Sequence, residues 1–176
     1  RIWPVIQPQI PTLDIQPLNK EVFAPFGTVI ETDGAKQISI NQGTTTRFDA
    51  MSGVDVEEAG GQPIISLFRG NRRLDPIEIH LLERHPLGSQ AFMPLSQYDW
   101  LVVVAHGNAA GDVPDFSTLV CFKASGIQGV SYNRGTWHHP LLTLQASQDF
   151  LVIDRQGDGH NLDEVWHDGP AAIIHP

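Results

Sequence analysis

Hydrophobic residues along the chain gather in short runs separated by turn-forming clusters. Apolar and β-branched runs lie at residues 64–68, 77–82, 101–104, 119–122, 141–144 and 150–153, with glycine-rich turns such as Gly60-Gly61 and Gly157-Asp158-Gly159 between them. Short runs punctuated by turn signals are typical of β-sandwiches and β-barrels. The pattern therefore predicts an all-β fold.

Only two short helices are predicted. Asn19 can cap a helix that runs to Phe23, because Pro25 and Gly27 follow and end it. Residues 54–59 form a second, weaker helical segment before a pair of glycines.

The length of 176 residues suits one domain, and neither an internal repeat nor a shift in composition marks a second. Prolines recur in the first 17 residues and exclude a regular helix there. We therefore expect a single domain over residues 1–176, with an extended N-terminal arm at 1–13 and a loose C-terminal tail at 167–176. The arm is expected to pack over the barrel or against a partner.

The arm predicts self-association. Its apolar residues are Ile2, Trp3, Val5, Ile6 and Ile10. So many apolar side chains are unfavourable in water, and we expect them to be covered in a homodimer.

Charge and composition narrow the classes of partner. There are 11 Lys and Arg against 20 Asp and Glu, so the net charge is −9 and phosphate backbones and anionic membranes would be repelled. No apolar stretch reaches the ~20 residues that span a bilayer. The single cysteine, Cys121, lies in an apolar run and cannot form an internal disulfide, which fits a cytoplasmic protein. No glycine-rich nucleotide loop is present, so neither NAD nor flavin is expected.

The richest polar cluster follows the run at 77–82. Strand alternation puts Glu83 and His85 on the face of Ile77 and Ile79, pointing inward, and His80 on the opposite face. A buried carboxylate beside a buried imidazole is costly unless it is compensated. A metal ion, or an anionic substrate with an arginine partner, would compensate it, and a structural Glu–His pair at a barrel mouth is equally compatible.

A second cluster contains Tyr132, His138 and His139. Adjacent residues of a strand face opposite sides, so at most one of the two histidines is expected to enter the same cavity. Taken without the first cluster, the two histidines could simply seal the end of a barrel. Taken together with Glu83 and His85, the second cluster supplies a further ligand for a divalent cation.

The spacing of these residues resembles the two-part signature of cupins. The matching segments are Glu83-x-His85, Gln90-x-Phe92-x-Pro94 and Asn133-x-Gly135-x-x-His138. The resemblance implies a double-stranded β-helix, or jelly-roll barrel, whose metal ligands are Glu83, His85, Gln90 and His138. Glu83 replaces the usual first histidine and Gln90 the usual glutamate, and a neutral amide is a weaker donor than a carboxylate.

Longer segments resemble the ureidoglycolate lyase family, also called ureidoglycolate hydrolases. They are residues 82–92, 129–141 and 149–155, within a resemblance that extends from about residue 14 to residue 166. The resemblance implies conversion of (S)-ureidoglycolate to glyoxylate and urea in allantoin breakdown, by a cytoplasmic homodimer. Nickel is associated with the family, and the reaction needs no redox cofactor.

The resemblance also suggests roles for individual residues. Glu83, His85 and His138 are the candidate catalytic cluster, as metal ligands together with Gln90 or as direct partners of the substrate. The candidates for binding the substrate are Arg47 and Arg69 at its carboxylate, Asn41 and Tyr132 at its ureido group, and Gln90.

Two other classes of function stay open. One is a different metal-dependent cupin, such as a dioxygenase or isomerase, although Glu83 and Gln90 count against it. The other is a non-catalytic module that binds a small ureide or sugar.

Overall fold

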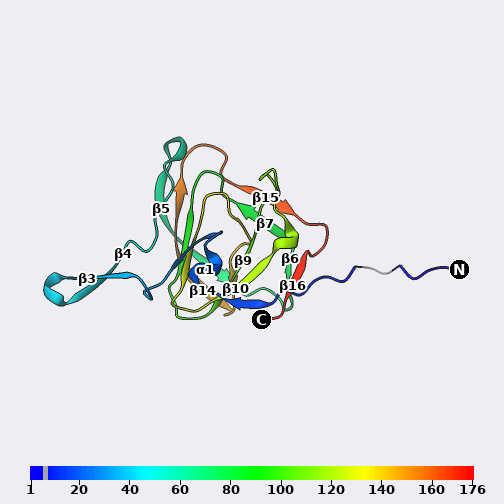
Figure 1. The fold of residues 1–176 in the computed structure, drawn as a ribbon, viewed down its shortest axis with the longest axis horizontal. Helices are drawn as coiled ribbons and strands as arrows, with labels where there is room; N and C mark the ends of the chain where they lie inside the picture. Colours follow the sequence, from blue (N-terminus) through cyan, green and yellow to red (C-terminus); the bar gives the residue numbers. More distant parts are fainter. Residues whose placement is uncertain (6–7) are drawn as a thin grey trace.

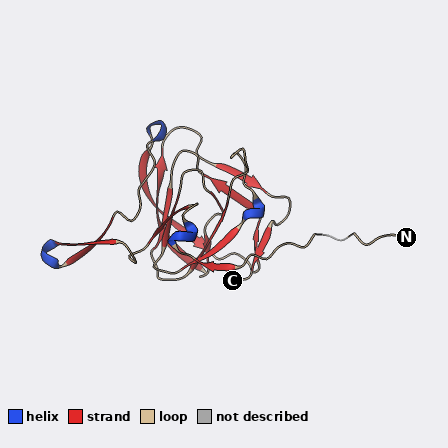
Figure 2. Ribbon diagram, viewed as in Figure 1, coloured by secondary structure: helices blue, strands red, loops and turns tan. Residues whose placement is uncertain are grey.

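Two stacked β-sheets form the body of the protein in the computed structural model, which describes residues 1–5 and 8–176 (Figures 1 and 2). The predicted all-β, cupin-like fold is confirmed. One sheet has the order β1 (Ile15–Pro17), β10 (Val120–Ala124), β9 (Trp100–Ala105), β12 (Trp137–His138), β7 (Leu81–Arg84) and β15 (Asp163–Trp166), and β13 (Leu142–Thr143) also pairs with β9. The other has the order β2 (Gly27–Ile30), β11 (Gly129–Tyr132), β8 (Gln90–Pro94), β14 (Ser147–Gln156) and β5 (Gln62–Asn71).

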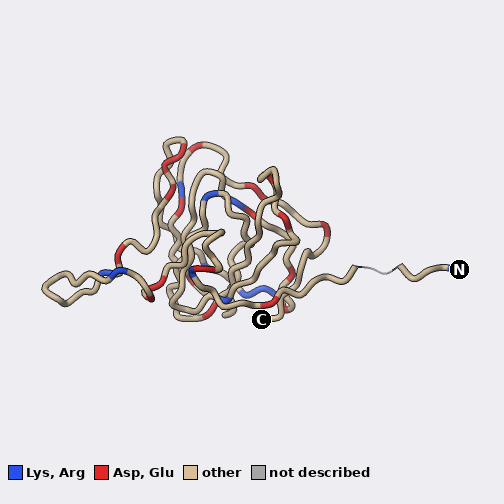
Figure 3. Tube along the Cα trace, in the orientation of Figure 1, with Lys and Arg blue, Asp and Glu red and all other residues tan. Residues whose placement is uncertain are grey.

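Two small ribbons accompany these sheets. β6 (Ile77–Ile79) pairs with β16 (Ala172–Ile174), and β3 (Lys36–Ile40) pairs with β4 (Thr45–Asp49). The β3–β4 hairpin projects from the body, at the left of Figure 1. Acidic residues are spread over the body of the molecule (Figure 3).

The first predicted helix is present and the second is not. Helix α1 spans Lys20–Phe23, and the Asn19 side chain accepts a hydrogen bond from the backbone N–H of Val22 at 3.0 Å. Residues 54–57 form no helix, and a 3₁₀ turn at Glu58–Gly60 is all that follows. Its central residue, Ala59, has a φ of 52°, which is incompatible with helix propagation. Further 3₁₀ turns lie at Asn41–Gly43 and Phe116–Thr118.

The strands enclose two apolar cores. Between the sheets, Val102 and Val104 of β9 pack in one cluster with Phe150 and Val152 of β14. The second core lies on the other side of β9, where residues such as Val103 meet the β6–β16 ribbon. Alternate residues of β9 thus contribute to different cores, which explains why this strand is buried throughout.

The C-terminal segment differs from the loose tail that we expected. Ala172 and Ile174 of β16 are 0% exposed and belong to the second core. Ile173, between them, is half-buried. This alternation is a strand pattern too short to stand out from the prolines beside it.

The N-terminal arm does not pack over the barrel along its first residues. Ile2, Trp3 and Val5 are 101%, 79% and 88% exposed, and the chain leads away from the body there (Figure 1). Ile6 lies outside the described residues. The arm joins the body at residues 11–13, where the carbonyl of Pro11 accepts from the N–H of Ile173 and the N–H of Leu13 donates to the carbonyl of Ile173.

The predicted alternation across residues 77–85 is interrupted at His80. Ile77 and Ile79 belong to the second core, and so does Leu82 rather than Leu81. The break has a physical reason: β6 pairs with β16, whereas β7 pairs with β12 and β15, so the chain changes sheets between them. Glu83 therefore faces the interior, as expected, but it does not share a face with Ile77 and Ile79.

Candidate active site

Three ligand-type side chains converge inside the sandwich. Glu83 of β7 and His138 of β12 are paired residues on antiparallel neighbours, and His85 follows β7 directly. One ligand atom from each of the three lies within 4.8 Å of the others. The cluster unites segments more than fifty positions apart in the sequence.

Backbone carbonyls orient both imidazoles of this cluster. Nδ1 of His85 lies 2.9 Å from the carbonyl oxygen of Asn161, and Nδ1 of His138 lies 2.9 Å from that of Thr136. A proton on each Nδ1 satisfies these contacts and leaves the lone pair of each Nε2 directed away from the carbonyl. The ring of His138 is further held by stacking on Tyr132, with 4.1 Å between the ring centroids.

The free ring nitrogens fit a metal ion. Nε2 of His85 and Nε2 of His138 are buried and have no hydrogen-bond partner among the described residues. The nearest carboxylate oxygen to His138 Nε2 is Oε1 of Glu83, at 3.5 Å. Buried polar atoms without partners are costly, and one divalent cation would satisfy both nitrogens and the carboxylate.

Gln90 lies on the inward face of β8, two residues before the buried Phe92. Its Nε2 donates to Oδ2 of Asp154 at 3.0 Å, while its Oε1 is buried without a partner in the described part of the chain. Asp154 thereby fixes the amide with its oxygen free. Arg155 does not pair with its neighbour Asp154 and donates instead to the carbonyls of Glu58 and Asp158.

The charge state of the cluster follows from its surroundings. Burial raises the pKa of Glu83, but the nearby imidazoles, His138 foremost, outweigh it, and the pKa lies below its ordinary value. Burial, with a smaller effect of Arg73, lowers the pKa of His139 to about 4, so this ring is neutral at pH 7. Burial, and then the Glu83 charge, raise the pKa of Tyr132, whose phenol keeps its proton.

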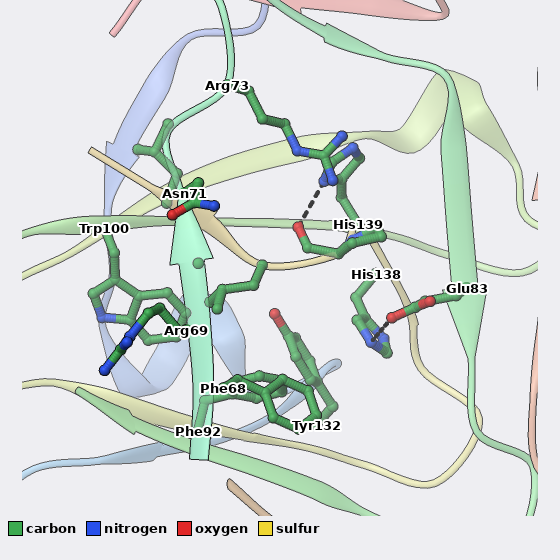
Figure 4. Close-up of a pocket in the computed structure, with 14 residues that line it drawn as sticks. Phe68, Arg69, Asn71, Arg73, Glu83, Phe92, Trp100, Tyr132, His138 and His139 are labelled. Atoms are coloured by element: carbon green, nitrogen blue, oxygen red, sulfur yellow. Dashed lines mark hydrogen bonds and ion pairs between the residues drawn. The ribbon is translucent and has the colours of Figure 1, made fainter. Parts of the chain in front are cut away.

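A cavity of about 360 Å³ opens onto Glu83 and His138 of this cluster, whereas His85 and Gln90 are not among the residues that line it (Figure 4). Its volume falls in the range of small-molecule sites, ~300–1,000 Å³. It is lined by Phe68, Arg69, Gly70, Asn71, Arg73, Glu83, Phe92, Trp100, Leu101, Tyr132, His138, His139, Pro140 and Leu141.

Both neighbouring histidines line the cavity, so the expectation that at most one would do so is wrong. The strand β12 ends at His138, and strand alternation no longer governs the position of His139. The rings of both residues are buried. The Nδ1 atom of His139 lies 2.7 Å from the carbonyl oxygen of Pro140.

Only some of the residues proposed to bind the substrate line the cavity. Tyr132 lines the cavity. Arg69 also lines it, but its guanidinium already makes two hydrogen bonds to Asp149, at 2.8 and 3.0 Å. In Figure 4 this guanidinium points away from His138.

Asn41 and Arg47 lie elsewhere in the chain. Both are exposed residues of the projecting hairpin, where Arg47 pairs with Asp49 at 2.7 Å and Asn41 donates to the hydroxyl of Thr45. Neither lines the cavity of its own chain.

The sequence interpretation missed Arg73. This residue follows β5, lines the cavity beside His139 and makes no ion pair within residues 1–5 and 8–176 (Figure 4). Its neighbour Arg72 is engaged by Asp75 and by the carbonyl of Leu144. The sequence does show a group of arginines near the end of a predicted strand. It does not reveal which of these arginines faces the cavity.

Comparisons with known proteins agree with these features. The sequence family described as ureidoglycolate lyase matches residues 10–174, a longer stretch than the 14–166 expected. A ureidoglycolate lyase of Burkholderia mallei (strain NCTC 10229) is 56% identical over 153 residues, 87% of this chain and 88% of that protein. Those of Pseudomonas entomophila (strain L48) and Pseudomonas syringae pv. tomato are each 50% identical, over 88% and 93% of this chain and 91% and 94% of theirs. The chain belongs to the ureidoglycolate lyase family.

Proposed function

We propose that this chain is a carbon–nitrogen lyase that converts (S)-ureidoglycolate to glyoxylate and urea in allantoin breakdown. Family membership over nearly the whole chain supports the reaction. The observation that carries it at the level of the site is the cluster of the half-buried Glu83 and His85 with the buried His138, beside a cavity of small-molecule size.

A divalent cation is proposed at this cluster. Its ligands would be a carboxylate oxygen of Glu83 and the Nε2 atoms of His85 and His138, with Oε1 of Gln90 as a fourth donor. Nickel is the proposed ion, since imidazole nitrogen suits it and the family resemblance implies it. When bound, the cation supplies a Lewis acid that lowers the pKa of the substrate hydroxyl.

The remaining chemistry is assigned to the side chains of the cavity. The hydroxyl of the substrate loses its proton, the carbonyl of glyoxylate forms as the C–N bond breaks, and the urea nitrogen gains a proton. These changes balance without water or a redox cofactor. Glu83 is the ionised carboxylate in the cavity, and the carboxylate oxygen that would not hold the cation is proposed to accept the hydroxyl proton.

Two further side chains are proposed to hold the substrate. The guanidinium of Arg73 is available for the substrate carboxylate, whereas that of Arg69 is occupied by Asp149. The phenol of Tyr132 retains its proton and can donate to the ureido carbonyl.

The cellular compartment and the oligomeric state of the enzyme are also part of the proposal. We place it in the cytoplasm as a homodimer, as the family resemblance implies. The short helices of the described residues offer no segment that could span a lipid bilayer.

The experiment is an assay of the purified protein with (S)-ureidoglycolate. Glyoxylate and urea are expected in equal amounts without added NAD or flavin, and a chelator should reduce turnover until nickel is restored. Ammonia in place of urea would assign the protein to the hydrolytic class. Binding of the substrate without turnover in the metal-loaded protein would support a non-catalytic module instead.

A further inference from the structure

The outer faces of the two sheets differ in how they are covered. The β6–β16 ribbon packs on the outer face of the sheet that contains β9. The outer face of the other sheet carries apolar side chains that are not fully buried. We call Ile65, Leu67, Met93, Leu151 and Ile153 the outer patch.

The outer patch is continuous across three strands. Leu67 of β5 lies opposite Leu151 of β14, which lies opposite Met93 of β8, and Ile65 lies opposite Ile153. Ile65 and Leu67 are 72% and 64% exposed. β5 is also the edge of its sheet, and a long edge strand with exposed apolar residues is prone to pair with another chain. Both features indicate a surface that another protein covers.

The β3–β4 hairpin is the second feature that indicates a partner, because it projects from the body and no other described strand pairs with it. Among the described strands, β3 and β4 pair with each other alone. A two-stranded hairpin is marginally stable in water when nothing packs against it. Ile38 lies opposite Arg47, and Ile40 is on the same side, so one face of the hairpin presents two apolar side chains and a cation.

We propose that the hairpin of one copy packs on the outer patch and β5 edge of a second copy, and brings Asn41 and Arg47 to the mouth of the partner copy's cavity. The hairpin and β5 lie on the same side of the body in Figure 1, so a twofold axis lets both copies exchange hairpins at once. A closed, reciprocal contact covers both patches and both hairpins.

The size of the proposed interface and the charge of the hairpin are consistent with a second copy as the occupant of the outer patch. A stable interface uses about 20–30 residues a side, and the hairpin at residues 36–49 together with the outer patch supplies about 20. The hairpin carries Lys36 and Arg47 against the single carboxylate of Asp49, whereas the whole chain carries −9 (Figure 3). A hairpin of opposite net charge offsets the repulsion between two acidic copies.

The geometry of β5 connects this interface to the cavity. Leu67 points outward into the patch, while its neighbour Phe68 lines the cavity together with Gly70. A hairpin that lies along the β5 edge is therefore beside the cavity mouth. Asn41 and Arg47, which do not reach their own cavity, would complete the partner's substrate site. The completion of the substrate site rests on the proposed function. The contact between the two copies does not depend on that function.

Light scattering of the intact protein at micromolar concentration tests the contact. The wild type should have twice the chain mass of 19.4 kDa, and Leu67→Glu and Ile38→Glu should each become monomeric. The matched control is Ile127→Glu, which introduces the same charge at a 58% exposed isoleucine on the turn between β10 and β11 and should stay dimeric. Replacing residues 36–49 by a short Gly-Ser linker provides a second monomeric variant.

A monomeric wild type would overturn the contact, and so would a linker variant that keeps its native circular dichroism and stays dimeric. A monomeric Ile127→Glu would show that any added charge dissociates the dimer, and would also overturn it. None of these outcomes depends on lyase activity.

Mixing two impaired variants tests the delivery of Arg47. His85→Ala disables the cluster, and Arg47→Ala should lower kcat/KM by about 10- to 100-fold through loss of a charged hydrogen bond. After subunit exchange about half of the dimers are mixed, and each has one complete site, so about a quarter of wild-type activity should return. No recovery, or full activity of Arg47→Ala alone, would overturn the delivery. A wild type without lyase activity would instead refute the proposed function and leave the light-scattering result standing.

Discussion

Replacing His85 by alanine is the sharpest test of the cluster, with His80→Ala as the matched control. The two histidines are five positions apart, but only His85 has a buried ring nitrogen among the ligand atoms of the cluster. His80 pairs with Glu78 at 2.9 Å, and both side chains are substantially exposed, 36% and 54%. The substitutions remove the same ring from very different surroundings.

The expected magnitudes follow from these surroundings. Removal of a residue that only supports a metal ligand costs about 10- to 100-fold in affinity or activity, and a ligand should cost more. We expect His85→Ala to lower kcat/KM by more than about 100-fold, which is about 2.7 kcal/mol of transition-state stabilisation. The lost hydrogen bond to Asn161 should cost about 1 kcal/mol of stability, or about 2–4 °C in Tm.

The assay follows glyoxylate and urea, with nickel content and thermal unfolding measured on the same samples. His80→Ala should keep kcat/KM within about twofold, because an exposed ion pair contributes little. His138→Ala should also abolish turnover, but its ring is 2% exposed and stacked on Tyr132, so stability should fall further. Near-normal kcat/KM in a folded His85→Ala, or equal damage in His80→Ala, would refute the position of the site on the inward face of β7.

Three further predictions concern separate parts of the molecule. Arg73→Ala should raise KM by about 10- to 100-fold, while Arg69→Ala, whose guanidinium is held by Asp149, should change it by less than about threefold; steady-state kinetics showing the reverse order would contradict the assignment. Burial raises the pKa of Cys121 to about 12, so a disulfide reagent at pH 8 should label the protein only after unfolding, and rapid labelling of the native protein would show that the thiol is accessible. Ile174→Ala should cost about 2–4 kcal/mol in guanidinium chloride unfolding and the half-buried Ile173→Ala clearly less; equal losses would mean that β16 is not packed as described.

The sequence alone determined those features that depend on a few neighbouring residues. Asn19 caps α1 because an amide side chain next to the first turn accepts a backbone N–H wherever that turn lies in the fold. The apolar runs became strands because alternating burial and turn residues act locally. Long motifs around His85 and His138 were enough to identify the family.

Tertiary structure decided what depends on which strands find each other. The change of sheets at His80 moved Leu82 into the second core, and no local signal marks it because the strand partners β12 and β16 lie far along the chain. Likewise, Ala172 and Ile174 became core residues only through their pairing with β6.

In the cavity, too, the types of side chain follow from the sequence and their positions follow from strand pairing. Glu83 and His138 meet because β7 and β12 are neighbours, and the end of β12 allows His139 to join them. Arg73, just after β5, lines the cavity, whereas Arg47, within β4, lies on the projecting hairpin. Side-chain chemistry could be read from the sequence, but the direction in which each side chain points depends on strand pairing over long distances along the chain.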